Sequence, residues 1–106
     1  MQGPETIGGR YELRGLLGRG GMAEVHDGWD TRLGRAVAIK LMRDDAALIA
    51  PERMRRRARF RRETSLCEAL RHPNIVARLD QGEAPDGRLF AVFALVEGRA
   101  GRYRTA

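Results

Sequence analysis

The sequence predicts an α+β domain in which one helix packs on an antiparallel sheet of five strands. Two observations lead to this fold class. Three β-prone segments come first, then one long segment of helix-forming residues, then two more β-prone segments. Short turn sequences join the first three strands to one another and also join the last two, and connections this short are typical of antiparallel neighbours.

The first three strands are expected near residues 11–18, 23–29 and 35–42. A glycine-rich segment, Gly18-Arg19-Gly20-Gly21, separates the first two strands, and the turn cluster from Asp30 to Gly34 separates the second from the third. Both separators consist mostly of residues that favour turns. Residues 1–10 are polar and contain glycine and proline, so we expect them to form a short lead-in.

The helix is expected to begin at Pro51 and to end near Arg71. Proline is favoured in the first turn of a helix, and no glycine or proline follows until His72-Pro73-Asn74. Proline disfavours helical geometry in the residue before it, so this tripeptide ends the helix. The last two strands are expected near residues 75–81 and 88–95, joined through the turn sequence Pro85-Asp86-Gly87.

Length and composition exclude several classes of protein. A chain of 106 residues allows one small domain. The longest apolar run, Leu89–Val96, is far shorter than the roughly 20 residues of a membrane-spanning helix. No secretory signal is visible at the N-terminus. The single cysteine, Cys67, excludes an internal disulfide and indicates a reducing compartment, so we expect a cytoplasmic protein without a membrane span.

The net charge of +6 comes from one segment. Residues 53–62 (RMRRRARFRR) contain seven arginines and no acid, and the rest of the chain has 13 basic and 14 acidic residues. A nucleic-acid-binding interpretation depends on this segment alone. Because no aromatic-rich or groove-reading motif accompanies the arginines, a solvated face of the helix explains them more simply. An arginine-rich nucleic-acid-binding domain remains a less favoured alternative.

The glycine-rich segment has three interpretations. A Walker A loop would need Gly-Lys-Ser/Thr after the glycines, and that sequence is absent. A dinucleotide-binding turn would need a helix next, but the strand-like AEVHDGW follows. The third interpretation is the flexible tip of a β-hairpin lying over phosphates, where the absence of side chains lets the backbone approach an anion. A glycine-rich hairpin without a ligand stays possible on these residues alone.

Lys40 is the only lysine among the twenty basic residues. Such a distribution suggests a site that needs a compact ammonium group rather than a planar guanidinium. Strand alternation puts Lys40 on one face with Ala36, Ala38 and Met42. The small Ala38 beside the cation leaves room for a flat ring whose phosphates reach the amine. The alternative is an ordinary surface lysine.

Glu63 falls at helical spacing within an apolar stripe made by Phe60, Leu66, Cys67 and Leu70. A carboxylate on the buried face of a helix is costly unless a counter-charge meets it. Lys40, on the sheet that the helix covers, is the expected partner. The alternative is an amphipathic helix with one misplaced acid.

Taken together, these residues resemble a known family. From Tyr11 to Gly98 the chain is similar to the N-terminal lobe of the bacterial eukaryotic-type Ser/Thr protein kinases. The first motif is the glycine loop LGRGGMAEV (Leu17–Val25), in which Ala23 stands where the family usually has a third glycine. The second is the strand motif Val37-Ala38-Ile39-Lys40, and the third is the helix segment that ends at Glu63. The loop His72-Pro73-Asn74-Ile75-Val76 follows, and LFAVFALVEG (Leu89–Gly98) resembles the fifth strand and hinge.

The resemblance implies ATP as cofactor. Leu17, Val25 and Ala38 would enclose the adenine, and Phe93 would be the gatekeeper. The backbone of Ala94 and Val96 would bind the adenine edge. Lys40 would hold the α- and β-phosphates, with Glu63 holding Lys40. The glycine-loop residues implied to contact the nucleotide are Leu17, Gly18, Arg19, Gly20, Gly21, Met22, Ala23 and Val25.

The motifs of the family's C-terminal lobe do not occur in these 106 residues: there is no H-R-D, D-F-G or A-P-E segment. We therefore expect a kinase N-lobe over residues 11–98 and a truncated or divergent basic tail over 99–106. Mg²⁺ and protein substrates would bind only with the missing lobe, so the chain alone should be inactive and could self-associate through the exposed lobe interface. A non-catalytic interaction module of the same shape is the alternative.

Overall fold

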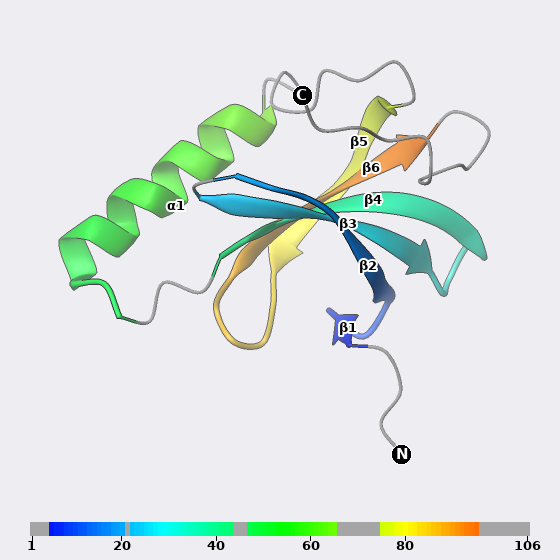
Figure 1. Ribbon diagram of the computed structural model, residues 1–106, viewed down its shortest axis with the longest axis horizontal. Coiled ribbons are helices and arrows are strands. Elements are labelled where there is room, and N and C mark those ends of the chain that lie inside the picture. The colour runs from blue at the N-terminus through cyan, green and yellow to red at the C-terminus, as the bar shows by residue number, and fades with distance from the viewer. Residues whose placement is uncertain (1–4, 21, 44–46, 66–74, 96–106) are drawn as a thin grey trace.

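The computed structural model of the protein describes residues 5–20, 22–43, 47–65 and 75–95. They form one antiparallel sheet and one helix (Figure 1). The elements are β1 (Thr6–Ile7), β2 (Tyr11–Arg19), β3 (Ala23–Asp30), β4 (Arg35–Met42), α1 (Ala50–Ser65), β5 (Ile75–Glu83) and β6 (Leu89–Leu95). The sheet order is β1-β2-β3-β4-β6-β5, and every pairing is antiparallel. The predicted α+β class is confirmed.

The sheet has six strands rather than the predicted five. The additional strand, β1, pairs with β2 and places the buried side chain of Ile7 in the core. Gly8 and Gly9, both at positive φ (62° and 69°), make the turn between the two strands. A strand of two residues has no alternation, so the sequence pattern could not identify it.

The other elements lie close to their predicted positions. The helix begins at Ala50, one residue before Pro51. Strand β4 matches the prediction, β2 and β3 each end one residue later, and β5 ends two residues later, at Glu83. The predicted helix end near Arg71 lies outside the described residues.

The two faces of β4 belong to different apolar clusters. Val37, Ile39 and Leu41 lie in the main core, whose other buried members are Ile7, Tyr11, Ala84, Phe90 and Val92. Ala38 and Met42 lie on the opposite face. The alternation expected for this strand is therefore confirmed. It puts Lys40 on the face opposite the main core.

Gly28 in β3 is required by close packing. A Cβ atom at this position would lie 2.4 Å from Cδ1 of Ile39 and 3.1 Å from the backbone oxygen of Glu12. The Ile39 side chain is fully buried and cannot move away freely. Position 28 therefore points into the main core, whereas its neighbours in β3 point to the other face.

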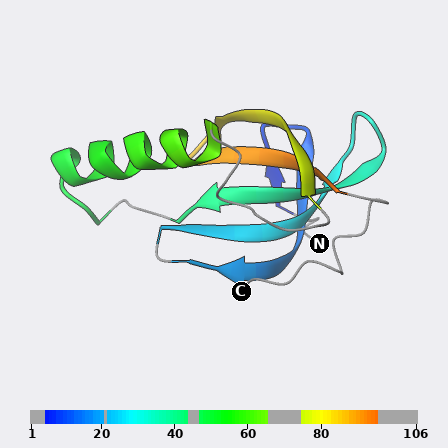
Figure 2. The same ribbon diagram turned by 90° about the horizontal axis from the view of Figure 1, so that it is seen from above.

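The helix packs against the end of the sheet where the β2–β3 hairpin closes. Figures 1 and 2 show α1 beside the sheet rather than across its centre. Phe60, only 2% exposed, inserts among Ala23, Met42 and Leu89. Arg57 adds an ion pair to Glu83 of β5, with Nη2 and Oε1 at 2.6 Å. This position brings the last turns of α1 close to β4.

A buried carboxylate fixes the turn between β3 and β4. Asp30 is 1% exposed and accepts two hydrogen bonds of 2.8 Å from Nε and Nη2 of Arg10. It also accepts bonds from the backbone amides of Arg32 and Leu33. The pair ties the β1–β2 connection to the neighbouring β3–β4 turn.

This pair predicts acid sensitivity. The hydrogen bonds from Arg10 lower the pKa of Asp30 from 3.8 to about 2. The group then stabilises the fold above pH 4, and this stabilisation is lost as the pH falls from about 4 towards 2. Thermal unfolding of the wild type and of Asp30→Asn should differ most at pH 7 and converge near pH 2. A constant difference between pH 7 and pH 2 would contradict the assignment.

Candidate functional site

Lys40 lies on β4, an inner strand of the sheet, on the face opposite the main core. Its strand neighbours are Val25 on β3 and Ala91 on β6. The residue is 8% exposed. Its Nζ lies 3.7 Å from Oε2 of Glu63 and 5.8 Å from the centroid of the Phe60 ring. The expected approach of Lys40 and Glu63 is confirmed.

Burial lowers the pKa of Lys40 below its ordinary value of 10.5. The charge of Glu63 and its hydrogen bond act in the opposite direction, and the positive charge of Arg59 adds to the lowering. The site therefore holds an ammonium group that burial penalises and one carboxylate supports. Additional negative charge placed beside Nζ would stabilise the protonated form.

Glu63 is the partly exposed carboxylate that meets Lys40, and its place within the expected apolar stripe is not tested, because Leu66, Cys67 and Leu70 lie outside the described residues. Its side chain is 35% exposed, whereas Phe60 and Thr64 are buried. Its second oxygen, Oε1, accepts a hydrogen bond of 3.1 Å from Nε of Arg59.

Beside Lys40, one apolar cluster joins four strands. It contains Val25 of β3, Ala38 of β4, and Ala91 and Phe93 of β6, with Leu17 of β2 and Ala36 packed against it. The structure thus brings together the four side chains for which the resemblance implies adenine contact: Leu17, Val25, Ala38 and Phe93. Ala91 was not predicted, although its place two residues before Phe93 indicates the same face.

Several members of this cluster are inaccessible in this structure. Ala38 and Ala91 are 0% exposed and Phe93 is 1% exposed. A planar ligand could contact Ala38 only if the groups around the cluster moved apart. Ala94, the next residue of β6, is also buried and has strand partners in both β4 and β5. Val96 lies outside the described residues.

The glycine-rich segment lies at the tip of the β2–β3 hairpin, which both the phosphate-covering interpretation and the ligand-free hairpin predicted. Gly20 N donates to the backbone oxygen of Ala23 at 2.8 Å, and Arg43 N donates to the oxygen of Met22 at 2.9 Å. The register of β2 shifts on either side of Leu16, so this strand is irregular before the tip. Gly21 lies outside the described residues.

The hairpin tip and Lys40 lie at the same end of the sheet. Ala23, the first residue of β3, pairs with Met42, and Val25 pairs with Lys40. Arg19, at the end of β2, is paired with Glu24 at 3.0 Å. Backbone amides of a glycine-rich tip and one buried ammonium group can together bind an anion.

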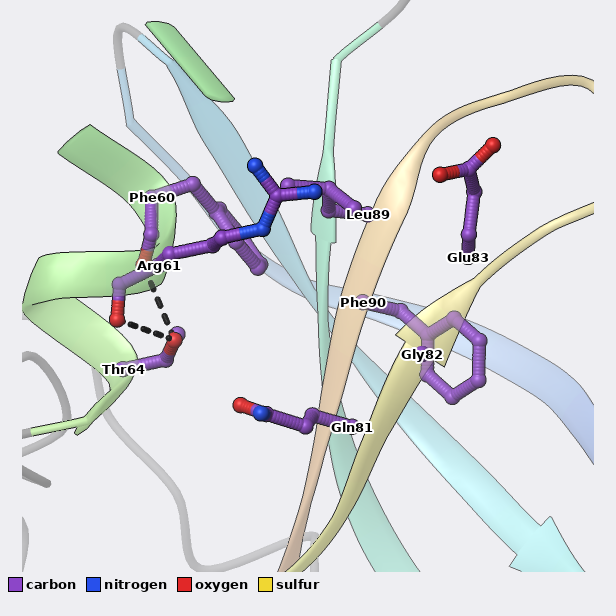
Figure 3. A pocket seen from close by; sticks show the side chains of 8 residues that line it. All are labelled: Phe60, Arg61, Thr64, Gln81, Gly82, Glu83, Leu89 and Phe90. Carbon is purple, nitrogen blue, oxygen red and sulfur yellow. Dashed lines mark hydrogen bonds between the residues drawn. The ribbon is translucent and has the colours of Figure 1, made fainter. Parts of the chain in front are cut away.

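A pocket of about 250 Å³ lies between α1 and the β5–β6 pair (Figure 3). It is lined by Phe60, Arg61, Thr64, Gln81, Gly82, Glu83, Leu89 and Phe90. The Thr64 hydroxyl already donates to the backbone oxygen of Phe60 at 2.9 Å, and Arg57 already binds Glu83. No sequence-based prediction placed a ligand here. Beside this pocket, α1 contacts the sheet through the buried side chain of Phe60 and through the ion pair of Arg57 with Glu83.

The arginine segment lies on α1, where most of its guanidinium groups are already paired. Arg55 and Arg56 contact Glu52, Arg57 contacts Glu83, and Arg59 contacts Glu63. The pairing agrees with a solvated helix face.

In residues 5–20, 22–43, 47–65 and 75–95 no three His, Cys, Asp or Glu side chains gather closely enough to hold a metal ion. No helix in the same ranges is long and apolar enough to cross a membrane.

Comparison with known proteins supplies the context for this geometry. No protein-family model matches the chain. A probable serine/threonine-protein kinase of Streptomyces coelicolor is 53% identical over 83 residues, which cover 78% of this chain and 12% of that protein. Serine/threonine-protein kinase PknB of Mycobacterium tuberculosis (strain H37Rv) is 46% identical over 101 residues, which cover 92% of this chain. The chain spans only 16% of PknB.

Among solved structures, the kinase domain of Mycobacterium tuberculosis PknI superposes with a TM-score of 0.55 and 26% identity. The match covers 89% of this chain and 35% of that one.

Proposed function

Because the chain belongs with the bacterial serine/threonine-protein kinases and has the fold of their N-terminal lobe, we propose that it binds ATP beneath the β2–β3 hairpin. One observation carries this proposal. The only lysine of the chain is buried beside the hairpin tip, with its Nζ 3.7 Å from the Glu63 carboxylate. An arrangement of glycine-rich tip, buried ammonium and supporting carboxylate suits the phosphates of a nucleotide.

Each group has a defined part in this proposal. The base lies against Leu17, Val25, Ala38 and Phe93, and the backbone of Ala94 and Val96 binds its edge. Backbone groups of the hairpin tip bind the phosphates, and the tip residues concerned are Gly18, Arg19, Gly20, Gly21, Met22 and Ala23. Lys40 donates hydrogen bonds to the α- and β-phosphate oxygens while Glu63 holds its ammonium group in position.

The electrostatics of Lys40 support this assignment. Burial lowers the pKa of its ammonium group, and only Glu63 opposes that effect. A bound polyphosphate would add the negative charge that the buried cation lacks. A guanidinium group is longer and planar, which explains why this position differs from the nineteen arginines of the chain.

Phosphoryl transfer to protein Ser or Thr is proposed only for a complete kinase that contains such a lobe. Mg²⁺ supplies charge neutralisation at the phosphates in that reaction, and the described residues offer no cluster to bind it. As the resemblance to the kinase family implies, Mg²⁺ and the protein substrate would bind with a C-terminal lobe. The single cysteine supports a reducing compartment such as the cytoplasm.

Replacing Lys40 by methionine should weaken ATP binding about tenfold or more, because a charge-assisted hydrogen bond to phosphate is lost. We expect the dissociation constant of this chain to be on the order of 1 mM or weaker, since the residues proposed to bind ATP contact it from one side only. An NMR titration with ATP measures both values. Arg35→Met, at the exposed start of the same strand, is the matched control and should bind as the wild type does.

Two results would contradict the proposal in different ways. Equal affinities of the wild type and Lys40→Met would remove Lys40 from the site. The absence of any nucleotide binding by the wild type, together with binding to a separate protein lobe, would favour the non-catalytic interaction module.

A further inference from the structure

Asp27 is a carboxylate on the proposed nucleotide face that no motif of the sequence singled out as a ligand-binding group. It follows Val25 by two residues in β3, so both side chains point to the same face. Gly28 faces the main core, as its contact distance to Ile39 shows, and this fixes the direction of its neighbour Asp27. Asp27 therefore shares a face with the apolar cluster beside Lys40.

The strand register places Asp27 relative to the groups proposed to bind ATP. Asp27 is paired with Ala38, and Ala38 is paired with Phe93, so these residues form one row across three strands. Val25, Lys40 and Ala91 form the next row, nearer the hairpin tip. Neighbouring strands lie about 4.8 Å apart, so the Asp27 row spans roughly 10 Å, which is the width of a nucleoside.

Asp27 differs from the other aspartates in the described part of the chain because its carboxylate lacks a side-chain partner there. Asp30 binds Arg10, Asp80 binds Tyr11 and Asp86 binds Arg88. Asp27 has only the backbone amide of Gly28 and the more distant charge of Arg14, and partial burial raises its pKa above the ordinary 3.8. A partly desolvated carboxylate of this kind costs stability unless a donor reaches it.

We propose that Asp27 accepts hydrogen bonds from the ribose hydroxyls of the bound nucleotide and makes the site prefer ribonucleotides. This inference rests on the proposed ATP site. If the base contacts Ala38 and turns its hydrogen-bonding edge to β6, its opposite side, which carries the sugar, faces β3. The phosphates then lie one row further on, at Lys40.

The chemistry of the sugar agrees with this placement. The 2′- and 3′-hydroxyl groups are the donors of a nucleotide that remain when the base edge is bound elsewhere, and an ionised carboxylate is purely an acceptor. The phosphates are anions and would be repelled by Asp27, so the carboxylate marks the sugar and not the phosphate end of the site.

The test compares the affinities of ATP and 2′,3′-dideoxy-ATP, followed by the NMR signal of the Trp29 indole, the only tryptophan of the chain. The wild type should bind ATP about tenfold more tightly. Asp27→Leu should reduce that ratio to about one, and Asp27→Asn, which keeps an acceptor, should give an intermediate ratio. Asp86→Asn on the β5–β6 turn is the control and should keep the wild-type ratio.

A thermal unfolding measurement separates recognition from a structural role. Because Asp27 is desolvated without a side-chain partner, Asp27→Leu should unfold at the same temperature as the wild type or higher. Binding of both nucleotides with an unchanged ratio in Asp27→Leu would overturn this inference and leave the proposed ATP site intact. No binding of either nucleotide to the wild type would overturn both.

Discussion

Replacing Phe60 by alanine should lower the free energy of unfolding by about 3–5 kcal/mol. Phe60 is 2% exposed and is the only residue of α1 within the apolar clusters of the described chain. Its ring fills the space between Met42, Leu89 and Ala23 and lies beneath the ammonium group of Lys40. The loss would be a large part of the total stability of a small domain, which is about 5–15 kcal/mol.

Urea unfolding of three variants measures this effect. Phe60→Leu keeps most of the buried apolar volume and should lose less than half as much as Phe60→Ala. Met54→Ala removes a side chain that is 69% exposed on the same helix and should change stability by no more than about 0.5 kcal/mol. If Phe60→Ala cost less than about 1 kcal/mol, α1 would not be held to the sheet by this side chain.

The second large effect is an absence of catalysis: this chain alone should transfer no phosphate from ATP to protein. Phosphoryl transfer depends on positioning and on charge stabilisation by metal ions. The H-R-D motif that carries the general base in the family does not occur in these 106 residues, and loss of a general base costs about 10²–10⁴ in rate. The described residues also show no metal-binding cluster.

The assay incubates the purified chain with labelled ATP, Mg²⁺ and a generic basic protein. We expect no incorporation above a control without the chain. Incorporation by the wild type that disappears in Lys40→Met would contradict the prediction. It would imply a metal site that sequence and structure have not revealed, and the acids to test first are Asp27, Asp30, Asp44 and Asp45.

Local sequence was sufficient for most of the strands and for the face of β4 on which Lys40 lies. The alternation of small and large residues in β4 assigned Val37 and Ile39 to one face and Ala38 and Lys40 to the other, and the structure has that arrangement. The glycine-rich tip was also predicted correctly as a hairpin. Both features depend only on residues that are close together in the sequence. Strand alternation and the conformational preferences of turn residues are therefore enough to predict them.

Two features were decided only by tertiary structure. Strand β1 exists because Ile7 is buried beside Tyr11 and Phe90, contacts that join distant parts of the chain. The contacts of Glu63 with both Lys40 and Arg59 depend on how α1 packs beside β4. Burial and exact neighbours of a side chain depend on which segments pack together, and periodicity within one segment carries no information about that choice.

The same reason explains why Asp27 was not predicted as a site residue. In the sequence it is one acid in a strand-like segment, with no motif around it. Asp27 lies in one row with Ala38 and Phe93 because β3 pairs with β4 and β4 pairs with β6. Strand β6 follows β4 by about fifty residues in the sequence. The sequence alone therefore determined the strands, the hairpin and the lysine, and the packing of the sheet determined which side chains surround that lysine.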